Sequence, residues 1–320
     1  MIKLPTPPQF TGAFFKRLSR IACSMLMLLA LATPLPAADM LYVSLDGDYI
    51  VSYDTTGNDG ATIAASEAFF AGTNLSLSVG LAFDSSGNLY AANYGNDTIS
   101  KFDASGGYVS NISSNLSGPW GLAFDSSGNL YAGNPNQNTI SKFNSSGGYV
   151  SSISSNLGTP GGLAFDSSGN LYAANYGGTI SKFDASGGYV SDISSNLSGP
   201  IGLAFDSSGN LYAANDTDNT ISMFDASGGY VSNISSNLDK PYGLAFDSSG
   251  NLYAANTGNK TISKFDASGT FLTSWSTASY PKFLAFQPVT VPEPSTYALA
   301  AIATGVMAYL ARRRNKARTA

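Results

Sequence analysis

Short hydrophobic runs separated by small polar residues recur along most of this 320-residue chain. Between Gly80 and Trp120, four such runs occupy residues 81–83, 89–92, 98–102 and 108–112. The segments at 84–88 and 103–107 read Asp-Ser-Ser-Gly-Asn and Asp-Ala-Ser-Gly-Gly. In such segments Asp and Ser oxygens cap backbone N–H groups, and Gly supplies the positive φ of a tight hairpin. The pattern therefore predicts four antiparallel strands, and no run shows the 3.6-residue spacing of a helix.

The same unit is written five times. The sequence GLAFDSSGNLYA begins at Gly80, Gly121, Gly162, Gly202 and Gly243, with spacings of 41, 41, 40 and 41 residues. A period in this range indicates a repeat architecture, and four strands in each period are typical of one blade of a β-propeller. A blade packs between two others, which explains why both faces of its inner strands are apolar.

The two ends of the repeat region complement each other. Residues 41–54 match the second and third strands of a unit but lack a first strand, whereas residues 281–286 match a first strand and then stop. We expect a sixth, composite blade from residues 39–79 and 283–288, which closes the ring and removes its open edges. The predicted fold is therefore all-β, a six-bladed β-propeller over residues 39–290.

The motif P-x-G-L-A-F-D-S-S-G-N-L-Y-A-A-N followed by T-I-S-K-F-D-x-S-G resembles NHL repeats. The resemblance covers roughly residues 40–288 and implies a six-bladed propeller. The same broad group contains streptogramin-lyase-like and gluconolactonase-like enzymes, so it leaves both binding and catalytic roles open.

The N-terminus has the pattern of a secretory signal peptide, over residues 1–38. Lys and Arg residues at 3, 16, 17 and 20 precede an apolar run at 21–31, and small residues follow at 37 and 38. Eleven apolar residues are too few for a retained membrane anchor, which needs about 20.

The C-terminus, residues 291–320, combines a short motif, an apolar segment at 296–311 and a basic stop at 312–318. The motif is Val291, Pro292, Glu293 and Pro294, and the basic stop begins with Arg312, Arg313 and Arg314. This order resembles a PEP-CTERM sorting signal, and basic residues after an apolar helix hold a tail on the cytoplasmic side. The resemblance implies a C-terminal transmembrane helix, recognition by an exosortase-type enzyme, transient anchoring, and delivery to the surface or exterior of a Gram-negative bacterium.

The charge of the propeller differs from that of the whole chain. Nine of the 16 basic residues lie in the two terminal segments, so residues 39–290 carry 7 Lys against 20 acidic residues, a net charge of 7 − 20 = −13. Such a surface repels phosphate backbones, which excludes nucleic acid as a partner. The only cysteine, Cys23, lies in the signal peptide, so the mature propeller has no disulfide. We expect a monomer.

Catalytic chemistry has few candidates. The chain has no histidine, which removes the commonest general base and transition-metal ligand, and the propeller has one glutamate, Glu67. The Asp-Ser-Ser-Gly-Asn turns lack the glycine position of a calcium-binding EF-hand loop, so turn capping explains them without a metal. We therefore predict no enzyme activity, no metal site and no cofactor. The alternative is a calcium-dependent lyase or hydrolase that uses carboxylates such as Asp97, Asp216 and Asp218.

Comparison of the units shows where they differ. In a four-stranded meander, the first and third turns lie at one end of the blade, and these are nearly invariant. Differences gather in the second turn and just before GLAF, which both lie at the other end. The candidate ligand-binding residues at this end are Tyr94, Trp120, Tyr176, Asp216, Asp218 and Tyr242. Aromatic rings that stack on sugars, beside polar groups for hydroxyls, favour a non-catalytic binding scaffold for exopolysaccharide or a matrix protein. A structural spacer without a ligand is the remaining alternative.

Overall fold

The computed structural model describes residues 39–46, 48–55, 65–71 and 74–288. The predicted signal peptide at 1–38 and the predicted sorting tail at 291–320 lie outside these residues. No helix in the described part of the chain is long and apolar enough to cross a membrane.

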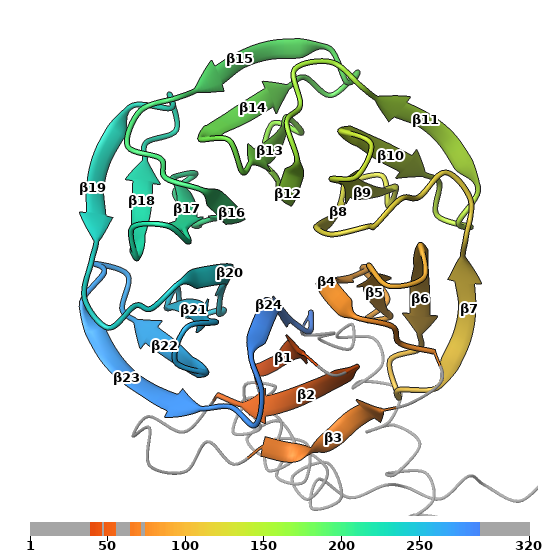
Figure 1. Cartoon of the computed structure of the whole chain (residues 1–320), viewed down its shortest axis with the longest axis horizontal. Coiled ribbons are helices and arrows are strands. Elements are labelled where there is room, and N and C mark those ends of the chain that lie inside the picture. The colour runs from red at the N-terminus through yellow and green to blue at the C-terminus, as the bar shows by residue number, and fades with distance from the viewer. Residues whose placement is uncertain (1–38, 47, 56–64, 72–73, 289–320) are drawn as a thin grey trace, which may run out of the picture. The chain divides into compact units, whose positions relative to one another are not determined.

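The described residues form six antiparallel four-stranded sheets arranged in a ring (Figure 1). The innermost strands are β24 (Pro281–Phe286), β4 (Ser78–Phe83), β8 (Leu122–Phe124), β12 (Pro160–Phe165), β16 (Pro200–Phe205) and β20 (Pro241–Phe246). The second strands are β1 (Met40–Leu45), β5 (Leu89–Asn93), β9 (Leu130–Asn134), β13 (Leu171–Asn175), β17 (Leu211–Asn215) and β21 (Leu252–Asn256). The prediction of a six-bladed propeller is confirmed.

The third and fourth strands complete each blade toward the rim. The third strands are β2 (Tyr49–Asp54), β6 (Thr98–Phe102), β10 (Thr139–Phe143), β14 (Thr179–Phe183), β18 (Thr220–Phe224) and β22 (Thr261–Phe265). The outer strands are β3 (Ala65–Ala71), β7 (Tyr108–Ile112), β11 (Tyr149–Ile153), β15 (Tyr189–Ile193), β19 (Tyr230–Ile234) and β23 (Phe271–Ser276). On most of the outer strands only the last residue is partly buried, so they form the solvent-facing rim.

The closing blade joins the two ends of the repeat region, as expected. Its strand order is β24-β1-β2-β3, and β24 pairs with β1 through Leu41 opposite Phe286 and Val43 opposite Leu284. β24 begins at Pro281, two residues before the expected boundary at 283. A strand from the C-terminal side of the repeat region therefore supplies the innermost strand that the N-terminal part of the closing blade lacks.

The hydrophobic core lies between blades rather than within them. One cluster combines Tyr90 and Ile99 of one blade with Leu122, Leu130 and Phe143 of the next, and each of these side chains is at most 7% exposed. All five residues of β5, β9, β13, β17 and β21 are buried, because these strands have neighbouring blades on both faces. This arrangement explains the apolar LYAAN sequence on both faces of one strand.

The first glycine of each repeated unit sets how closely the blades approach. A Cβ atom on Gly80 would lie 1.9 Å from the carbonyl oxygen of Trp120, and one on Gly202 would lie 2.1 Å from that of Tyr242. The same clash recurs at Gly121, Gly162 and Gly243. The invariant glycine is therefore required by backbone-to-backbone packing around the centre of the ring.

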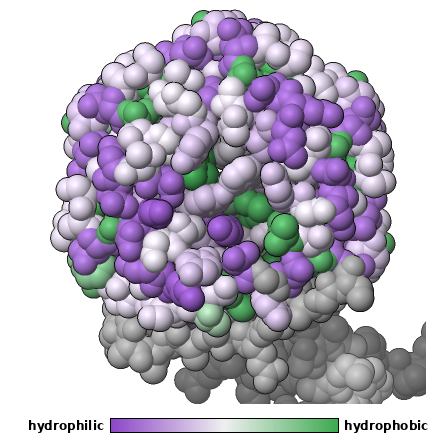
Figure 2. Space-filling view, in the orientation of Figure 1, coloured by the Kyte–Doolittle hydropathy of each residue, from purple (hydrophilic) through white to green (hydrophobic). Residues whose placement is uncertain are grey.

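The two ends of the ring differ in sequence and are named here accordingly. The uniform end carries the turns between the first and second strands and between the third and fourth strands of each repeated blade. The variable end carries the turns between the second and third strands and the links from one blade to the next. In the space-filling view of Figure 2 the centre of the ring is hollowed, with hydrophobic residues inside it and hydrophilic residues around it.

Candidate functional site at the variable end of the ring

Two aromatic side chains meet across the centre of the ring. Trp120 precedes β8 and Tyr242 is the second residue of β20, and these strands belong to opposite blades of the six (Figure 1). Their rings stack with centroids 6.0 Å apart and planes inclined by 21°. Tyr94, from the neighbouring blade, meets Trp120 edge-on at 5.8 Å. Three residues chosen from sequence variation thus form one aromatic cluster.

A cavity of 310 Å³ lies beside this cluster. It is lined by Asp46, Leu77, Ser78, Val79, Tyr94, Trp120, Tyr242 and Lys282. The residues come from the closing blade, from the link before β4 and from the starts of the innermost strands. The cavity therefore joins apolar walls to one carboxylate and one ammonium group.

Tyr242 is held from several sides. The ring of Phe283 meets it edge-on at 5.6 Å, and Lys282 Nζ lies 5.2 Å from its centroid. Burial raises the pKa of the Tyr242 hydroxyl well above its usual value, and the negative charge of Asp216 adds to this shift. The hydroxyl therefore stays protonated at physiological pH and is available as a hydrogen-bond donor.

Trp120 places a buried polar group next to Tyr242. Its Nε1 atom has no partner at full hydrogen-bond geometry among the described residues. It lies close enough to the Tyr242 hydroxyl to oppose the rise in the pKa of that group, although burial outweighs this effect. The two side chains therefore interact through their polar atoms as well as through their rings.

The remaining sequence-predicted residues divide into two groups. Tyr176 and Asp216 act electrostatically on the Tyr242 hydroxyl, so they belong to the same region. Asp218 instead accepts a hydrogen bond from Thr220 Oγ1 within its own exposed turn and does not line the cavity. The structure thus separates Asp218 from the aromatic cluster, because its side chain is used to cap the turn.

The two charged residues that line the cavity were missing from the sequence-based site. Lys282 occupies the position just before the first-strand motif, in register with Trp120 and Tyr242, so alignment of the units gives a signal for it. Asp46 follows β1 in the closing blade and is in register with Tyr94, so the match of residues 41–54 to a unit gives a signal for it as well.

A buried asparagine in each repeated blade positions the link that leads to this site. Asn134 at the end of β9 donates from Nδ2 to Thr139 Oγ1 and Ser141 Oγ, at 3.3 and 3.0 Å. Its Oδ1 accepts the backbone N–H of Ser117, three residues before Trp120. Equivalent bonds hold the other links through Asn93, Asn175, Asn215 and Asn256.

We expect Asn134→Ala to lower the free energy of unfolding by about 2–3 kcal/mol, because it leaves buried hydroxyl and N–H groups without partners. Chemical denaturation measures this loss. The Trp120 fluorescence should also change, because the link before it loses its anchor. Gln137→Ala is the control, since Gln137 is exposed in the following turn. Equal stability of the two variants would contradict the role of Asn134.

At the uniform end, Asp carboxylates accept hydrogen bonds from their own turns and lie near lysine side chains. Asp166 Oδ1 accepts the N–H groups of Ser168 and Asn170, and its Oδ2 lies 3.8 Å from Lys182 Nζ. Burial alone would raise the pKa of Asp166, but the hydrogen bonds from Asn170 and Ser168 and the charge of Lys182 lower it below its usual value. These contacts are what turn capping predicts, and they leave little of the carboxylate for a metal ion.

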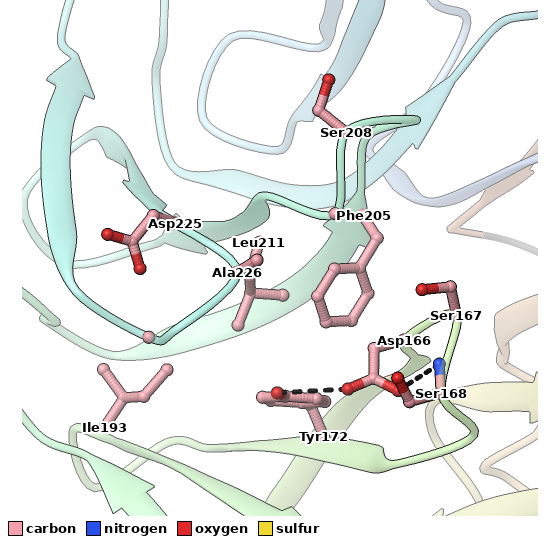
Figure 3. Close-up of a pocket in the computed structure, with 12 residues that line it drawn as sticks. Asp166, Ser167, Ser168, Tyr172, Ile193, Phe205, Ser208, Leu211, Asp225 and Ala226 are labelled. Atoms are coloured by element: carbon pink, nitrogen blue, oxygen red, sulfur yellow. Dashed lines mark hydrogen bonds between the residues drawn. The ribbon is translucent and has the colours of Figure 1, made fainter.

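A small cavity of 130 Å³ lies at this end between the blades of β12 and β16 (Figure 3). Figure 3 shows Asp166 hydrogen-bonded to Tyr172 and Ser168 at its edge. Phe205, Leu211 and Ala226 supply apolar walls. Because these residues recur in the other units, this cavity follows from the repeat rather than marking a distinct site.

Comparison with known families identifies the C-terminal segment. Residues 290–314 match the PEP-CTERM protein-sorting motif. The predicted sorting signal is confirmed. This motif marks proteins that are exported, processed at the membrane and then held at the cell surface or secreted in Gram-negative bacteria. A comparison with curated proteins found no match.

Solved structures with a similar fold come from different functional classes. The nidogen/laminin complex contains a chain with a TM-score of 0.68 and 18% identity, covering 78% of this chain and 98% of that one. A protein of unknown function from Bacteroides caccae has a TM-score of 0.63 and 13% identity, covering 78% and 99%. A streptogramin B lyase has a TM-score of 0.59 and 16% identity, covering 79% and 92%.

A further neighbour is a catalytically inactive histidine-to-alanine variant of virginiamycin B lyase from Staphylococcus aureus with quinupristin. Its TM-score is 0.55 at 13% identity, covering 67% of this chain and 85% of that one. At these identities the similarity establishes the fold alone. The chain is therefore an exported six-bladed β-propeller that carries a PEP-CTERM sorting motif at residues 290–314.

Proposed function

We propose that this exported propeller is a non-catalytic binding scaffold at the cell surface or in the extracellular matrix, and that its variable end binds sugar residues of an exopolysaccharide. The observation that carries the proposal is the stack of Trp120 and Tyr242 beside a cavity of 310 Å³. Aromatic faces bind the apolar faces of sugar rings, while a few polar groups fix their hydroxyls. The Tyr242 hydroxyl, which stays protonated, and the Asp46 and Lys282 side chains that line the cavity supply the polar groups.

The lyase neighbours raise a catalytic alternative, but the chain lacks a residue type that one of them needs. The virginiamycin B lyase variant is inactive when one histidine is replaced by alanine. This sequence has no histidine at any position. A reaction that depends on such a side chain has no counterpart here.

The calcium-dependent alternative would need carboxylates that converge. Asp97 follows β5, and Asp216 and Asp218 follow β17, so they lie on opposite blades. Asp97 Oδ1 accepts the Gly118 N–H at 2.6 Å. Within the described residues, no group of three or more metal-ligating side chains is found. Calorimetric titration with calcium tests this alternative directly, and binding with release of sugar fragments would favour it over the scaffold.

We expect Trp120→Ala and Tyr242→Ala each to weaken retention on the organism's own exopolysaccharide by about 30-fold, which corresponds to about 2 kcal/mol for a buried aromatic anchor. Affinity electrophoresis of the secreted protein measures the retention. Tyr189→Ala is the control, because Tyr189 is 42% exposed on the rim and far from the cavity lining. Unchanged retention of both site variants would refute sugar binding at this end.

A further inference from the structure

The direction of β24 determines where the sorting tail leaves the propeller. Lys282, near the start of this strand, lines the cavity at the variable end. The strand ends at Phe286, and Gln287 then donates its N–H to the Met40 carbonyl and accepts the Tyr42 hydroxyl on its Oε1 atom. Gln287 also approaches Gly87, in the first turn of the β4 blade, at the uniform end. The chain therefore exits from the uniform end.

The tether between propeller and sorting motif is short. Only three residues separate Gln287 from Val291, so the motif lies at most about 14 Å of extended chain from the uniform end. β24 is an innermost strand, so the tether starts near the centre of the ring rather than at its rim (Figure 1). An enzyme that binds residues 291–294 must therefore come up against the uniform end itself.

The uniform end carries a repeated set of ionised carboxylates. The first and third turns of the repeated blades contain nine Asp residues. Four Lys side chains lie within 4 Å of Asp carboxylates there, so the net charge of this set is 4 − 9 = −5. Asp184 and Asp225 are exposed, and hydrogen bonds from Ser186 and Ser227, with neighbouring N–H groups, lower their pKa values. These groups stay charged and favour a cationic partner surface.

We infer that the uniform end is the surface that docks against the membrane-embedded sorting enzyme, through cationic groups of that enzyme. The variable end then points away from the membrane during processing. In this orientation the aromatic cavity remains accessible to ligands outside the cell while the sorting enzyme cleaves the C-terminal tail. The inference rests on the exit of the chain and on charge, and it holds whether or not the cavity binds sugar.

Site-specific photocrosslinking tests the orientation. A photoreactive amino acid replaces Ser85, in an exposed turn at the uniform end, or Gln137, in an exposed turn at the variable end, in the full chain expressed in its host with an inactivated sorting enzyme. We expect a crosslink to the enzyme from position 85 and none from position 137. Equal crosslinks from both positions, or none from position 85, would overturn the inference.

A matched pair of charge variants tests the chemistry of the contact. D184N/D225N removes two charges from the uniform end, and D97N/D218N removes two from the variable end. Both should fold, because Asn144 caps its turn as Asp184 does, and Asn138 and Asn259 make the bonds of Asp97 and Asp218. We expect tail cleavage to slow about tenfold in the first variant only. Equal rates in pulse-chase experiments with the two variants would overturn the charge-based contact.

Discussion

Gly202→Ala should lower the free energy of unfolding by about 3 kcal/mol or more, with a fall in Tm of about 10 °C. The added Cβ would lie 2.1 Å from the Tyr242 carbonyl oxygen and 3.0 Å from the Cα of Gly243. Neither obstacle is a flexible side chain that could rotate away. The backbone of β16 or β20 must move, and in a closed ring each innermost strand has a neighbour on both sides, so the movement cannot be absorbed locally.

The control for this prediction is Gly177→Ala. Gly177 lies in an exposed turn, and a Cβ there would meet no atom within 4 Å. We expect its stability to stay within about 0.5 kcal/mol of the parent protein. Thermal and urea unfolding of the two variants provides the comparison. A small, equal effect of both substitutions would mean that the spacing of the blades does not depend on the first glycine of the unit.

Much of the fold follows from the sequence because the same unit recurs in register. The run at 89–92 predicted a strand that the structure extends by one residue to Asn93, and the Asp-Ser-Ser-Gly-Asn turns form the capped hairpins expected of them. The sixth blade was also predictable, because a strand missing at one end of the repeats matched a spare strand at the other. Repetition thus supplied what an isolated unit could not: the number of blades and the way the ring closes.

The candidate site was only partly predictable, for physical reasons. Sequence variation pointed to the variable end and to Trp120 and Tyr242, but it could not show that these rings stack across the ring centre. That contact depends on the width of the channel, which the backbone approach at the first glycines sets. Asp218 varies too, yet its side chain caps its own turn. Variation therefore locates an end of the ring, whereas local hydrogen bonding decides which side chains face the cavity.

Removal of the closing strand β24 should destabilise the ring, and two truncated chains distinguish this loss of stability from the loss of sorting. A chain that ends at Pro288 lacks the sorting motif but keeps β24, whereas a chain that ends at Tyr280 lacks both. We expect both to lose attachment at the cell surface. Only the shorter chain should also lose its cooperative unfolding transition, because removal of Leu284 and Phe286 uncovers Leu41 and leaves β1 without its inner partner.

Cell fractionation and thermal unfolding measure the two losses independently. The shorter chain should aggregate or expose hydrophobic surface, since an open ring presents unpaired edges on β1 and uncovered faces on β4 and β20, which β24 contacts in the intact ring. A synthetic peptide of residues 281–288 should restore part of its stability, because it carries the whole of β24. If the two truncated chains unfold at the same temperature, the closing strand is dispensable and the other five blades hold the ring by interblade packing alone. A stable chain ending at Pro288 that still attaches to the surface would instead place the retention signal within the propeller.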